Sequence, residues 1–444
     1  MRRTPLLLVT VLALGLVGIG ATAAPASETG DSSGDLGHQV LPANDGWASS
    51  GTGTTGGAAA AADHVFTISN RQELVAALGG DNATNRLNAT PKIIYVRGTI
   101  DGSVDDAGQP LGCDDFADPA YSLDAYLVQY DPATWGRVVT SGPLEDARAR
   151  SQRNQTARIQ INVGSNTTIV GLGRDASLVG TNLVVSAVDN VIVRNLDVEA
   201  PLDCFPRWDP TDGADGNWNS SQDAISLLGA THVWVDHVTV SDGDHPDSEQ
   251  PVFFGRPFQG HDGALDVTRG ADLVTVSWSV FRDHDKSLLI GASDTATTDP
   301  GKLRVTLHHN LFSNLIQRAP RVRFGQVHIY DNLYVIPGGD YGYSWGVGVQ
   351  SAIYAESNFF IAAVGVEPAD FLFDWGGTAI HATGTLVNGV ARSNQVDVLA
   401  AYNAAHDPDF SSDVGWTPTL HTRIDPPQLV PVLVAIGAGA GHLR

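Results

Sequence analysis

The sequence predicts an all-β protein folded as a parallel β-helix, in which successive coils of the chain stack and bury alternate side chains. Three observations lead to this prediction: strand-like runs dominate the chain, six blocks within them share one pattern, and the shortest interval between two such blocks is 22 residues. At about 3.3 Å per strand residue, a coil of that length has a perimeter of about 70 Å, enough for three short strands and their corners.

The strand-like runs are rich in β-branched and aromatic residues. They span Lys92–Val96, Thr168–Val170, Val191–Val198, His232–Val240, Leu273–Phe281, Arg304–Phe312, Val327–Val335 and Ile353–Ile361. One short N-terminal capping helix is expected before them, because Asn70 and Glu73 have the spacing of a capping box and Gly79 supplies a stop. After residue 79, helical periodicity is scarce.

The later runs contain a repeated block of five residues. The blocks read RNLDV, DHVTV, SWSVF, HHNLF, YDNLY and ESNFF, and they begin at residues 194, 236, 277, 308, 330 and 356. The excess over 22 residues in the longer coils is expected to protrude as loops. One aligned column holds Asn310, Asn332 and Asn358, and another holds Val240, Phe281, Phe312, Tyr334 and Phe360. We expect both columns to form ladders along the stack.

Two other folds fit part of this pattern. A β-sandwich also has strands at short intervals, but it does not require an in-register column of asparagines at turns. Residues 171–176 (GLGRDA) follow a strand and resemble a dinucleotide-binding fingerprint. Residues 177–185, however, have the pattern of another strand, not of the helix that would hold a pyrophosphate. The β-helix is therefore the preferred interpretation.

The composition indicates a globular, acidic protein. Hydrophobic residues make up 42% of the 444 and charged residues 17%, which is too apolar for a disordered chain and too low in charge for a coiled coil. The 26 Lys and Arg against 49 Asp and Glu give a net charge of −23, which argues against nucleic-acid or anionic-membrane partners. We expect a monomer.

The first residues have the layout of a secretory signal. Arg2 and Arg3 precede an apolar run from Pro5 to Ile19, and small residues follow it up to Ala26. The run is too short for a convincing spanning helix. The sequence therefore predicts a signal peptide over residues 1–26, a single domain over residues 27–444 and a secreted, extracellular protein. Residues 27–62 have the Gly, Ser, Thr and Ala content of a linker, although Trp47 within them indicates some anchoring.

Two cysteines, Cys113 and Cys204, are too few for a disulfide framework. They are either bonded to each other, as an oxidising compartment would permit, or two buried thiols. The sequence leaves both alternatives open.

Candidate functional residues are concentrated between residues 205 and 325, in the coils with the longest insertions. Asp223, Asp262 and Asp266 are hard oxygen ligands without a nearby cysteine, and they suit Ca²⁺ better than Zn²⁺. Each of them alone is more often a turn or cap residue.

Cationic residues follow in the next coils. Lys286, Arg318, Arg321 and Arg323 need an anionic partner or nearby carboxylates, because the protein as a whole is acidic. A ladder of surface ion pairs is the simpler explanation. His308 and His309 are adjacent in a strand-like block, where neighbours face opposite ways, so we expect stacking or hydrogen bonding and not one shared metal ion.

At this point the sequence resembles the extracellular pectate lyases of polysaccharide lyase family 1. The resemblance is carried by VWVDH, FFGRPFQGHDGALDV, DHDKSLLIGASD and RVTLHHNLFSNLIQRAPRVRFGQVHIYDNLY, and it extends over roughly residues 36–440. It implies a right-handed parallel β-helix and Ca²⁺-dependent β-elimination of polygalacturonate to 4,5-unsaturated oligogalacturonates. Matched residue by residue, it implies Asp223, Asp262 and Asp266 as calcium ligands, Arg318 as catalytic base, and Lys286 and Arg323 as binders of the substrate carboxylate.

Three other functions remain open from the sequence. A polygalacturonase-type hydrolase needs a carboxyl pair, for which Asp262 and Asp266 are available. A calcium-independent pectin lyase would have no use for three aspartates. A non-catalytic glycan-binding β-helix would show no turnover at all with Ca²⁺ supplied.

Overall fold

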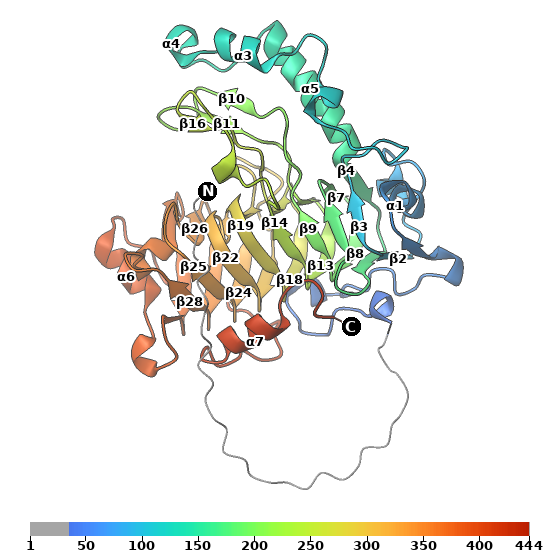
Figure 1. Ribbon diagram of the computed structural model, residues 1–444. Coiled ribbons are helices and arrows are strands. Elements are labelled where there is room, and N and C mark those ends of the chain that lie inside the picture. Colours follow the sequence, from blue (N-terminus) through green and yellow to red (C-terminus); the bar gives the residue numbers. More distant parts are fainter. Residues whose placement is uncertain (1–34, 444) are drawn as a thin grey trace, which may run out of the picture. The chain divides into compact units, whose positions relative to one another are not determined.

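Each complete coil of the chain gives one strand to each of three parallel sheets, which together form the predicted β-helix (Figure 1). The computed structural model describes residues 35–443. Sheet 1 contains, in spatial order, β1 (Val65–Ile68), β2 (Lys92–Val96), β5 (Thr167–Gly171), β8 (Asp189–Arg194), β13 (Thr231–Asp236), β18 (Asp272–Ser277), β21 (Val305–His308), β24 (Gln326–Tyr330), β27 (Ala352–Glu356) and β30 (Ile380–Thr383).

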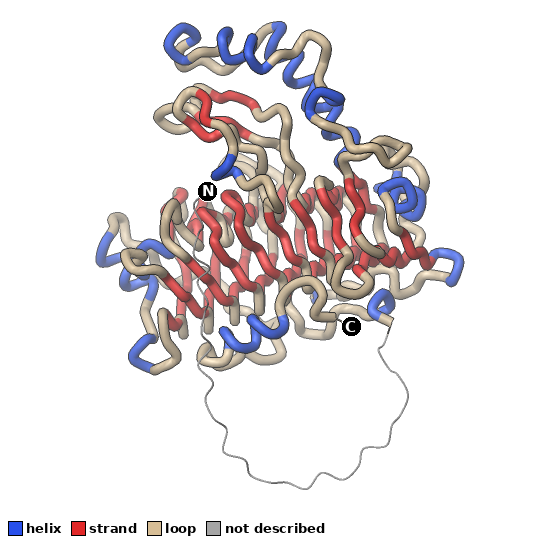
Figure 2. The backbone as a smooth tube through the Cα atoms, in the orientation of Figure 1, coloured by secondary structure: helices blue, strands red, loops and turns tan. Residues whose placement is uncertain are grey.

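The other two sheets follow the same order of coils, and Figure 2 shows their strands stacked along one axis. Sheet 2 contains β3 (Thr99–Asp101), β6 (Ser177–Val179), β9 (Asp197–Glu199), β14 (Thr239–Ser241), β19 (Val280–Lys286), β22 (Leu311–Gln317), β25 (Leu333–Ile336), β28 (Phe359–Ala362) and β31 (Leu386–Val387). Sheet 3 contains β4 (Gln160–Val163), β7 (Asn182–Ser186), β12 (Ile225–Leu228), β17 (Leu265–Thr268), β20 (Leu288–Ile290), β23 (Arg321–Val322), β26 (Trp345–Gly348) and β29 (Leu372–Trp375).

The long strand-like runs of the sequence are each two strands on different sheets, which corrects the prediction of single runs. One residue between the two strands has a left-handed backbone with φ between 48° and 54°. These bend residues are Asn195, His237, Trp278, His309, Asp331 and Ser357. A residue in this conformation turns the chain sharply, so the following strand leaves sheet 1 and joins sheet 2. The apolar alternation continues through the bend, which is why the sequence pattern shows no break.

Both predicted ladders are present inside the coil. The Asn332 side chain accepts a hydrogen bond from the backbone N–H of Asn310 at 2.9 Å, and Asn358 accepts one from the N–H of Asn332 at 3.1 Å. The aromatic column stacks with ring centroids 5.6 Å apart for Phe281 and Phe312, shortening to 4.3 Å for Tyr334 and Phe360. Repetition at the coil spacing therefore becomes direct contact between neighbouring coils.

Replacing Asn332 with alanine is expected to destabilise the β-helix. The Asn332 side chain is fully buried and also donates to the Leu307 carbonyl at 2.9 Å. Its removal leaves buried backbone groups without partners, each costing about 1–3 kcal/mol. Urea denaturation should show a lower midpoint with an unchanged slope, and an unchanged midpoint would contradict a stabilising role for this ladder.

Helices lie outside the coil, and only the first of them was anticipated from the sequence. The short helix α1 (Arg71–Leu78) begins and ends where expected, with the Asn70 side chain accepting from the Glu73 N–H. The sequence indicated little helix after it, but α5 (Pro143–Ile159) has 17 residues. The reason is that its buried face includes the polar residues Glu145, Arg148, Ser151 and Gln155. A search for apolar periodicity misses such a helix.

The remaining helices are short. They are α2 (Cys113–Phe116), α3 (Leu123–Gln129), α4 (Pro132–Trp135), α6 (Val398–Ala405) and α7 (Val430–Gly437), with 3₁₀ turns at Leu36–His38, Trp47–Ser49, Ala62–His64, Asn85–Leu87, Asp247–Glu249, Pro368–Phe371 and Arg392–Asn394. In the part of the chain that the structure describes, no helix has the length and apolar character needed to cross a membrane. The predicted signal peptide lies outside the described residues.

The segment from residue 35 to 62 packs along sheet 1, although its composition suggested a linker. Backbone N–H groups of Trp47, Ala48 and Gly57 donate to threonine hydroxyls of three different sheet 1 strands at 2.8–3.1 Å. At Gly57 a Cβ atom would lie 2.0 Å from the Lys92 carbonyl oxygen, so the close approach requires glycine. Glycine and small residues here serve packing, not flexibility.

Candidate active site

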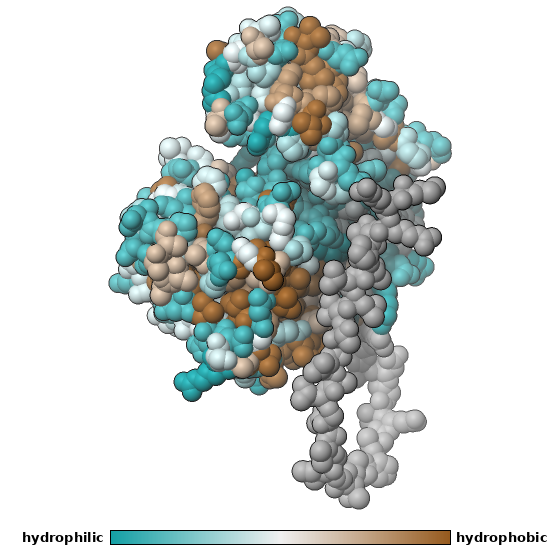
Figure 3. Space-filling model, turned by 60° about the vertical axis from the view of Figure 1, so that its left-hand side comes forward, coloured by the Kyte–Doolittle hydropathy of each residue, from teal (hydrophilic) through white to brown (hydrophobic). Residues whose placement is uncertain are grey.

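Long insertions leave the coil at one corner, where strands of sheet 2 end and strands of sheet 3 begin. The helical insertion with α2 to α5 lies between β3 and β4. Two hairpins follow in later coils, formed by β10 (Arg207–Asp209) with β11 (Asn217–Asn219) and by β15 (Val252–Phe253) with β16 (Arg256–Pro257). Figure 1 shows these insertions on the same side of the stack. In Figure 3, hydrophilic surface lines the recess between the upper lobe and the coils below.

The corner brings the sequence-predicted residues of four successive coils into one column. Ala224, next to Asp223, donates its N–H to the Gly263 carbonyl at 2.9 Å, and Ala264 donates to the Ser287 carbonyl at 2.9 Å. In the next coil, the Leu288 N–H donates to the Arg318 carbonyl at 2.6 Å. These backbone hydrogen bonds place Asp223, Asp262, Lys286 and Arg318, or the residues next to them, at equivalent positions in four successive coils.

Three carboxylates gather at this corner. Burial, followed by repulsion from Asp262, raises the pKa of Asp223 to about 7. Burial and the neighbouring carboxylates Asp223 and Asp262 raise the pKa of Asp266 well above its usual range. Binding of a proton or of a cation by these carboxylates is therefore strongly favoured.

Gly263 lets the carboxylates come together. A Cβ atom on it would lie 2.2 Å from Asp266 Oδ1, so the Asp266 carboxylate packs directly on the glycine backbone. The Gly263 N–H donates to Asp223 Oδ1 at 3.0 Å, which orients the second carboxylate. Oriented, oxygen-only ligands fit a divalent cation such as Ca²⁺, and Asp223, Asp262 and Asp266 are the residues that would hold it.

Arg318 lies at the same corner with a left-handed backbone, φ 63°. Its carbonyl accepts from Leu288, and the following Ala319 donates to the Ser344 carbonyl at 2.7 Å, so neighbouring coils fix this conformation from both sides. The positive charge of Arg318 partly offsets the rise in the pKa of Asp223 and of Asp266, as expected of a cation near both carboxylates. Its Nε atom is buried without a hydrogen-bond partner among the described residues.

Lys286 and Arg323 are held by carboxylates on either side. Lys286 Nζ lies 3.4 Å from Asp262 Oδ1, and the side chain is largely buried. Arg323 donates through Nε to Asp294 and through Nη1 to the Gly291 carbonyl at 2.8 Å. Between Arg323 and Arg318, burial and the charge of Arg323 lower the pKa of Arg321 to about 10.

A buried pair behind the corner, His284 and Asp242, was not predicted as a pair, although His284 lies within the DHDKSLLIGASD motif. His284 Nδ1 hydrogen-bonds to Asp242, and Nε2 lies 2.8 Å from the Asp262 carbonyl oxygen. Although burial alone would lower it, the Asp242 carboxylate raises the pKa of His284 to about 9. The charged ring thereby fixes the Asp262 backbone. If the sequences of the two coils are aligned at their repeated blocks, Asp242 and His284 fall within one position of each other. This alignment is the sequence signal that could have revealed the pair.

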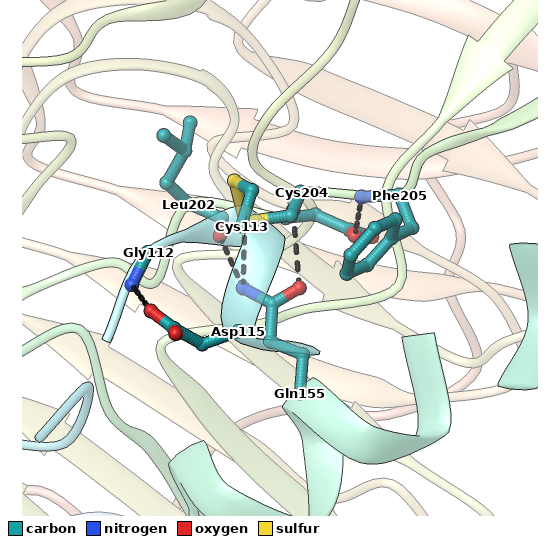
Figure 4. The surroundings of a disulfide bond; sticks show 8 residues. Gly112, Cys113, Asp115, Gln155, Leu202, Cys204 and Phe205 are labelled. Carbon is teal, nitrogen blue, oxygen red and sulfur yellow. Dashed lines mark hydrogen bonds between the residues drawn. A yellow bond between two sulfur atoms is a disulfide. The ribbon is translucent and has the colours of Figure 1, made fainter. Parts of the chain in front are cut away.

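A disulfide bond joins Cys113 and Cys204, which resolves the alternative that the sequence left open (Figure 4). It connects α2 to the loop before β10, so it links two of the insertions around the corner. Gln155 of α5 accepts from the Cys204 N–H at 3.0 Å and donates to the Leu202 carbonyl at 2.7 Å. Tyr126, Trp208 and Trp218 form a buried aromatic cluster between the same insertions.

The double substitution Cys113→Ser with Cys204→Ser is expected to lower the thermal stability of the insertions. The two cysteines are 91 residues apart, and closing a loop of that length contributes at most about 4–5 kcal/mol in the chain-entropy model. Calorimetry of the variant and of wild type should show the loss. Equal melting temperatures would mean that the aromatic cluster alone holds the insertions together.

Comparison with known proteins identifies the family of the chain. The sequence matches the pectate lyase family over residues 120–371. It is 48% identical over 443 residues to a pectate lyase of Bacillus subtilis, with 99% of each chain covered. It is 40% identical over 326 residues to pectate lyase E of Dickeya chrysanthemi, covering 72% of this chain and 67% of that one.

Solved structures agree as well. A thermostable pectate lyase superposes with a TM-score of 0.90 at 51% identity, covering 92% of this chain and all of the other. A pectate lyase bound to a hexasaccharide superposes with a TM-score of 0.87 at 49% identity, with the same coverage.

Fold and site together define a β-helical polysaccharide lyase. The chain belongs to the pectate lyase family. The resemblance stated from the sequence is thus confirmed, and so are the enzyme class and the β-helical fold.

Proposed function

We propose that this pectate lyase depends on Ca²⁺ and cleaves polygalacturonate by β-elimination to give 4,5-unsaturated oligogalacturonates. The observation that carries the proposal is the corner column, in which three mutually repelling carboxylates lie beside Lys286 and Arg318. The hexasaccharide bound to a relative of 49% identity supports an extended glycan substrate.

The reaction removes a weakly acidic proton from C5 of a galacturonate unit, next to a negatively charged carboxylate. When bound, Ca²⁺ supplies Lewis-acid neutralisation of that carboxylate. Lys286 and Arg323 bind the same carboxylate and stabilise the charge that develops on it. The neutral guanidine of Arg318 takes the C5 proton on a nitrogen, and the electron pair of that C–H bond forms the C4–C5 double bond. The C4–oxygen bond breaks, and the oxygen leaves on the neighbouring sugar with the electron pair of that bond and takes a proton from water.

Two features of this chain support Arg318 as the base. Its Nε has no partner among the described residues, and its backbone is fixed by the adjacent coils, so the side chain is positioned before substrate arrives.

The test is incubation of the purified protein with polygalacturonate, with and without EDTA, while ultraviolet absorbance of the unsaturated product is followed. We expect absorbance to rise with Ca²⁺ and to stop in the chelator. New reducing ends without absorbance would indicate the hydrolase alternative, and activity unchanged in EDTA would refute calcium dependence.

We further propose that the protein is exported. The basic and apolar leader in residues 1–26 supports this, and so does the Cys113–Cys204 disulfide, since such bonds persist in oxidising compartments. N-terminal sequencing of protein recovered from the culture medium should begin shortly after residue 23. Recovery of the intact chain only from the cell interior would contradict the proposal.

A further inference from the structure

A second cluster of polar side chains lies where sheet 1 turns into sheet 2. It consists of His309, Asp331 and Asp425, which we call the His309 cluster, and one ligand atom from each lies within 4.8 Å of the others. His309 and Asp331 are the bend residues of two successive coils. Asp425 comes from the C-terminal segment, and its N–H donates to Asp331 Oδ2 at 2.8 Å. The cluster therefore joins two coils to a segment far away in sequence.

The cluster lies apart from the corner that holds Arg318. His309 precedes β22 and Arg318 follows it, and the seven-residue strand between them spans roughly 20 Å at about 3.3 Å per residue. The two sites therefore do not share ligands.

The Asp331 carboxyl group is the most enclosed part of the cluster. Its side chain is fully buried, and its Oδ1 atom has no hydrogen-bond partner among the described residues. Arg423 pairs with Asp425 through Oδ1 and not with Asp331. A buried carboxylate oxygen without a partner calls for a cation or a proton.

His309 and its neighbour His308 have fewer N–H hydrogens than the polar contacts around their two rings require. His309 Nδ1 lies 2.9 Å from His308 Nδ1, and His309 Nε2 lies 3.3 Å from Asp425 Oδ2. At the other end, His308 Nε2 lies 3.1 Å from Asp45 Oδ1. Two neutral imidazoles carry two hydrogens for these three gaps.

The position of these two hydrogens decides what His309 presents to the carboxylates. If His309 donates from Nδ1 to His308, the Nε2 lone pair of His309 faces Asp425 and Asp331. A cation between them would then hold all three groups together.

Two of the three distances in the cluster lie close to those of tetrahedral coordination. Ligand atoms at about 2.0–2.2 Å from a tetrahedral Zn²⁺ lie about 3.3–3.6 Å from one another. His309 Nε2 lies 3.3 Å from Asp425 Oδ2 and 3.7 Å from Asp331 Oδ2. The ring of His309 is fixed by stacking on Trp278, with centroids 4.2 Å apart.

We propose that His309, Asp331 and Asp425 form a binding site for a first-row divalent metal ion, of which Zn²⁺ is the probe, and that the metal fastens the C-terminal segment to the β-helix. An imidazole nitrogen among the ligands favours Zn²⁺ over Ca²⁺, which prefers oxygen alone. Water fills the fourth position. The metal is structural in this proposal and takes no part in glycan cleavage.

The experiment is a calorimetric titration of the protein with Zn²⁺ in buffer saturated with Ca²⁺, so that the oxygen-only site is filled. Wild type is expected to bind one equivalent of Zn²⁺ at the His309 cluster. Asp425→Asn and His309→Asn should weaken this binding by about 100-fold or more, since even loss of an outer partner of a metal ligand costs 10- to 100-fold. Asparagine suits position 309 because it tolerates the left-handed backbone there.

Arg423→Gln is the matched control. It breaks the ion pair with Asp425 but removes no ligand, so it should bind Zn²⁺ as wild type does. Titration with Co²⁺ should give the visible absorption of a tetrahedral site in wild type and in this control only, and Zn²⁺ should raise the melting temperature of the same two proteins.

Failure to bind Zn²⁺ in wild type would overturn the proposal, and so would equal binding by wild type and Asp425→Asn. Neither result depends on glycan cleavage. Wild-type binding and its Co²⁺ spectrum decide the question even if a variant does not fold. Lyase activity in Ca²⁺, assayed in parallel, tests the function at the other corner separately.

Discussion

Replacing Arg318 with lysine is expected to lower kcat by about 10²-fold or more, on the usual scale for loss of a general base. Lysine keeps a nitrogen base and a positive charge, but its flexible stem and single nitrogen do not reproduce the geometry of the guanidine group. The Arg318 backbone is fixed by Leu288 and Ser344 in the coils on either side, so it cannot shift to compensate for a changed side chain. The Ca²⁺ requirement and the fold should change little, because the three aspartates are untouched.

The matched comparison is Arg323→Lys. Arg323 is proposed to bind the substrate carboxylate, a role in which another cation partly substitutes, so this change should mainly raise KM. Steady-state kinetics on polygalacturonate at saturating Ca²⁺ separate the two parameters for both variants. If Arg318→Lys kept most of kcat while Lys286→Ala abolished it, the roles of Arg318 and Lys286 would have to be exchanged.

Features that repeat at the coil spacing were predictable from the sequence. The asparagine column, for example Asn310 and Asn332, and the aromatic column from Phe281 to Phe360 became ladders because stacking converts a sequence interval into contact. The bends did not repeat in residue type, since Trp278, His309 and Asp331 all adopt the left-handed conformation there. Tertiary stacking imposes this conformation against the preference of tryptophan, so no local signal marked the turn.

The sequence predicted some residues of the candidate site and missed others. Asp223, Asp262, Asp266, Lys286 and Arg318 were named from residue type and from resemblance, and the structure brings them to one corner. His284 was missed because its partners, Asp242 and the Asp262 carbonyl, lie in other coils.

The buried face of α5 was missed for a related reason. Arg148 on that face donates to Glu145 on the same helix and to the Phe205 carbonyl of another insertion. When the buried face of a helix is polar and forms long-range hydrogen bonds, the sequence of the helix shows no periodic pattern of apolar residues.

Asp266→Asn is expected to raise the Ca²⁺ concentration needed for half-maximal activity by at least about tenfold, because it removes one charged ligand of three. It should not weaken the fold. Asparagine still offers an oxygen to the Leu289 N–H, which Asp266 Oδ1 now accepts at 3.2 Å. In EDTA its melting temperature should equal or exceed that of wild type, because one of three mutually repelling buried carboxylates is gone.

The control for this variant is Asp285→Asn. Asp285 lies one residue before Lys286 and pairs with Gln259 and Gln317 at 3.0 Å, outside the proposed ligand set, so its loss should leave the Ca²⁺ requirement unchanged. Calcium titrations of activity and melting curves in EDTA distinguish the two variants. An Asp266→Asn protein that melted earlier in EDTA but needed no more Ca²⁺ would show that Asp266 supports the fold. In that case the wild-type carboxylates would be held together without any need for a metal.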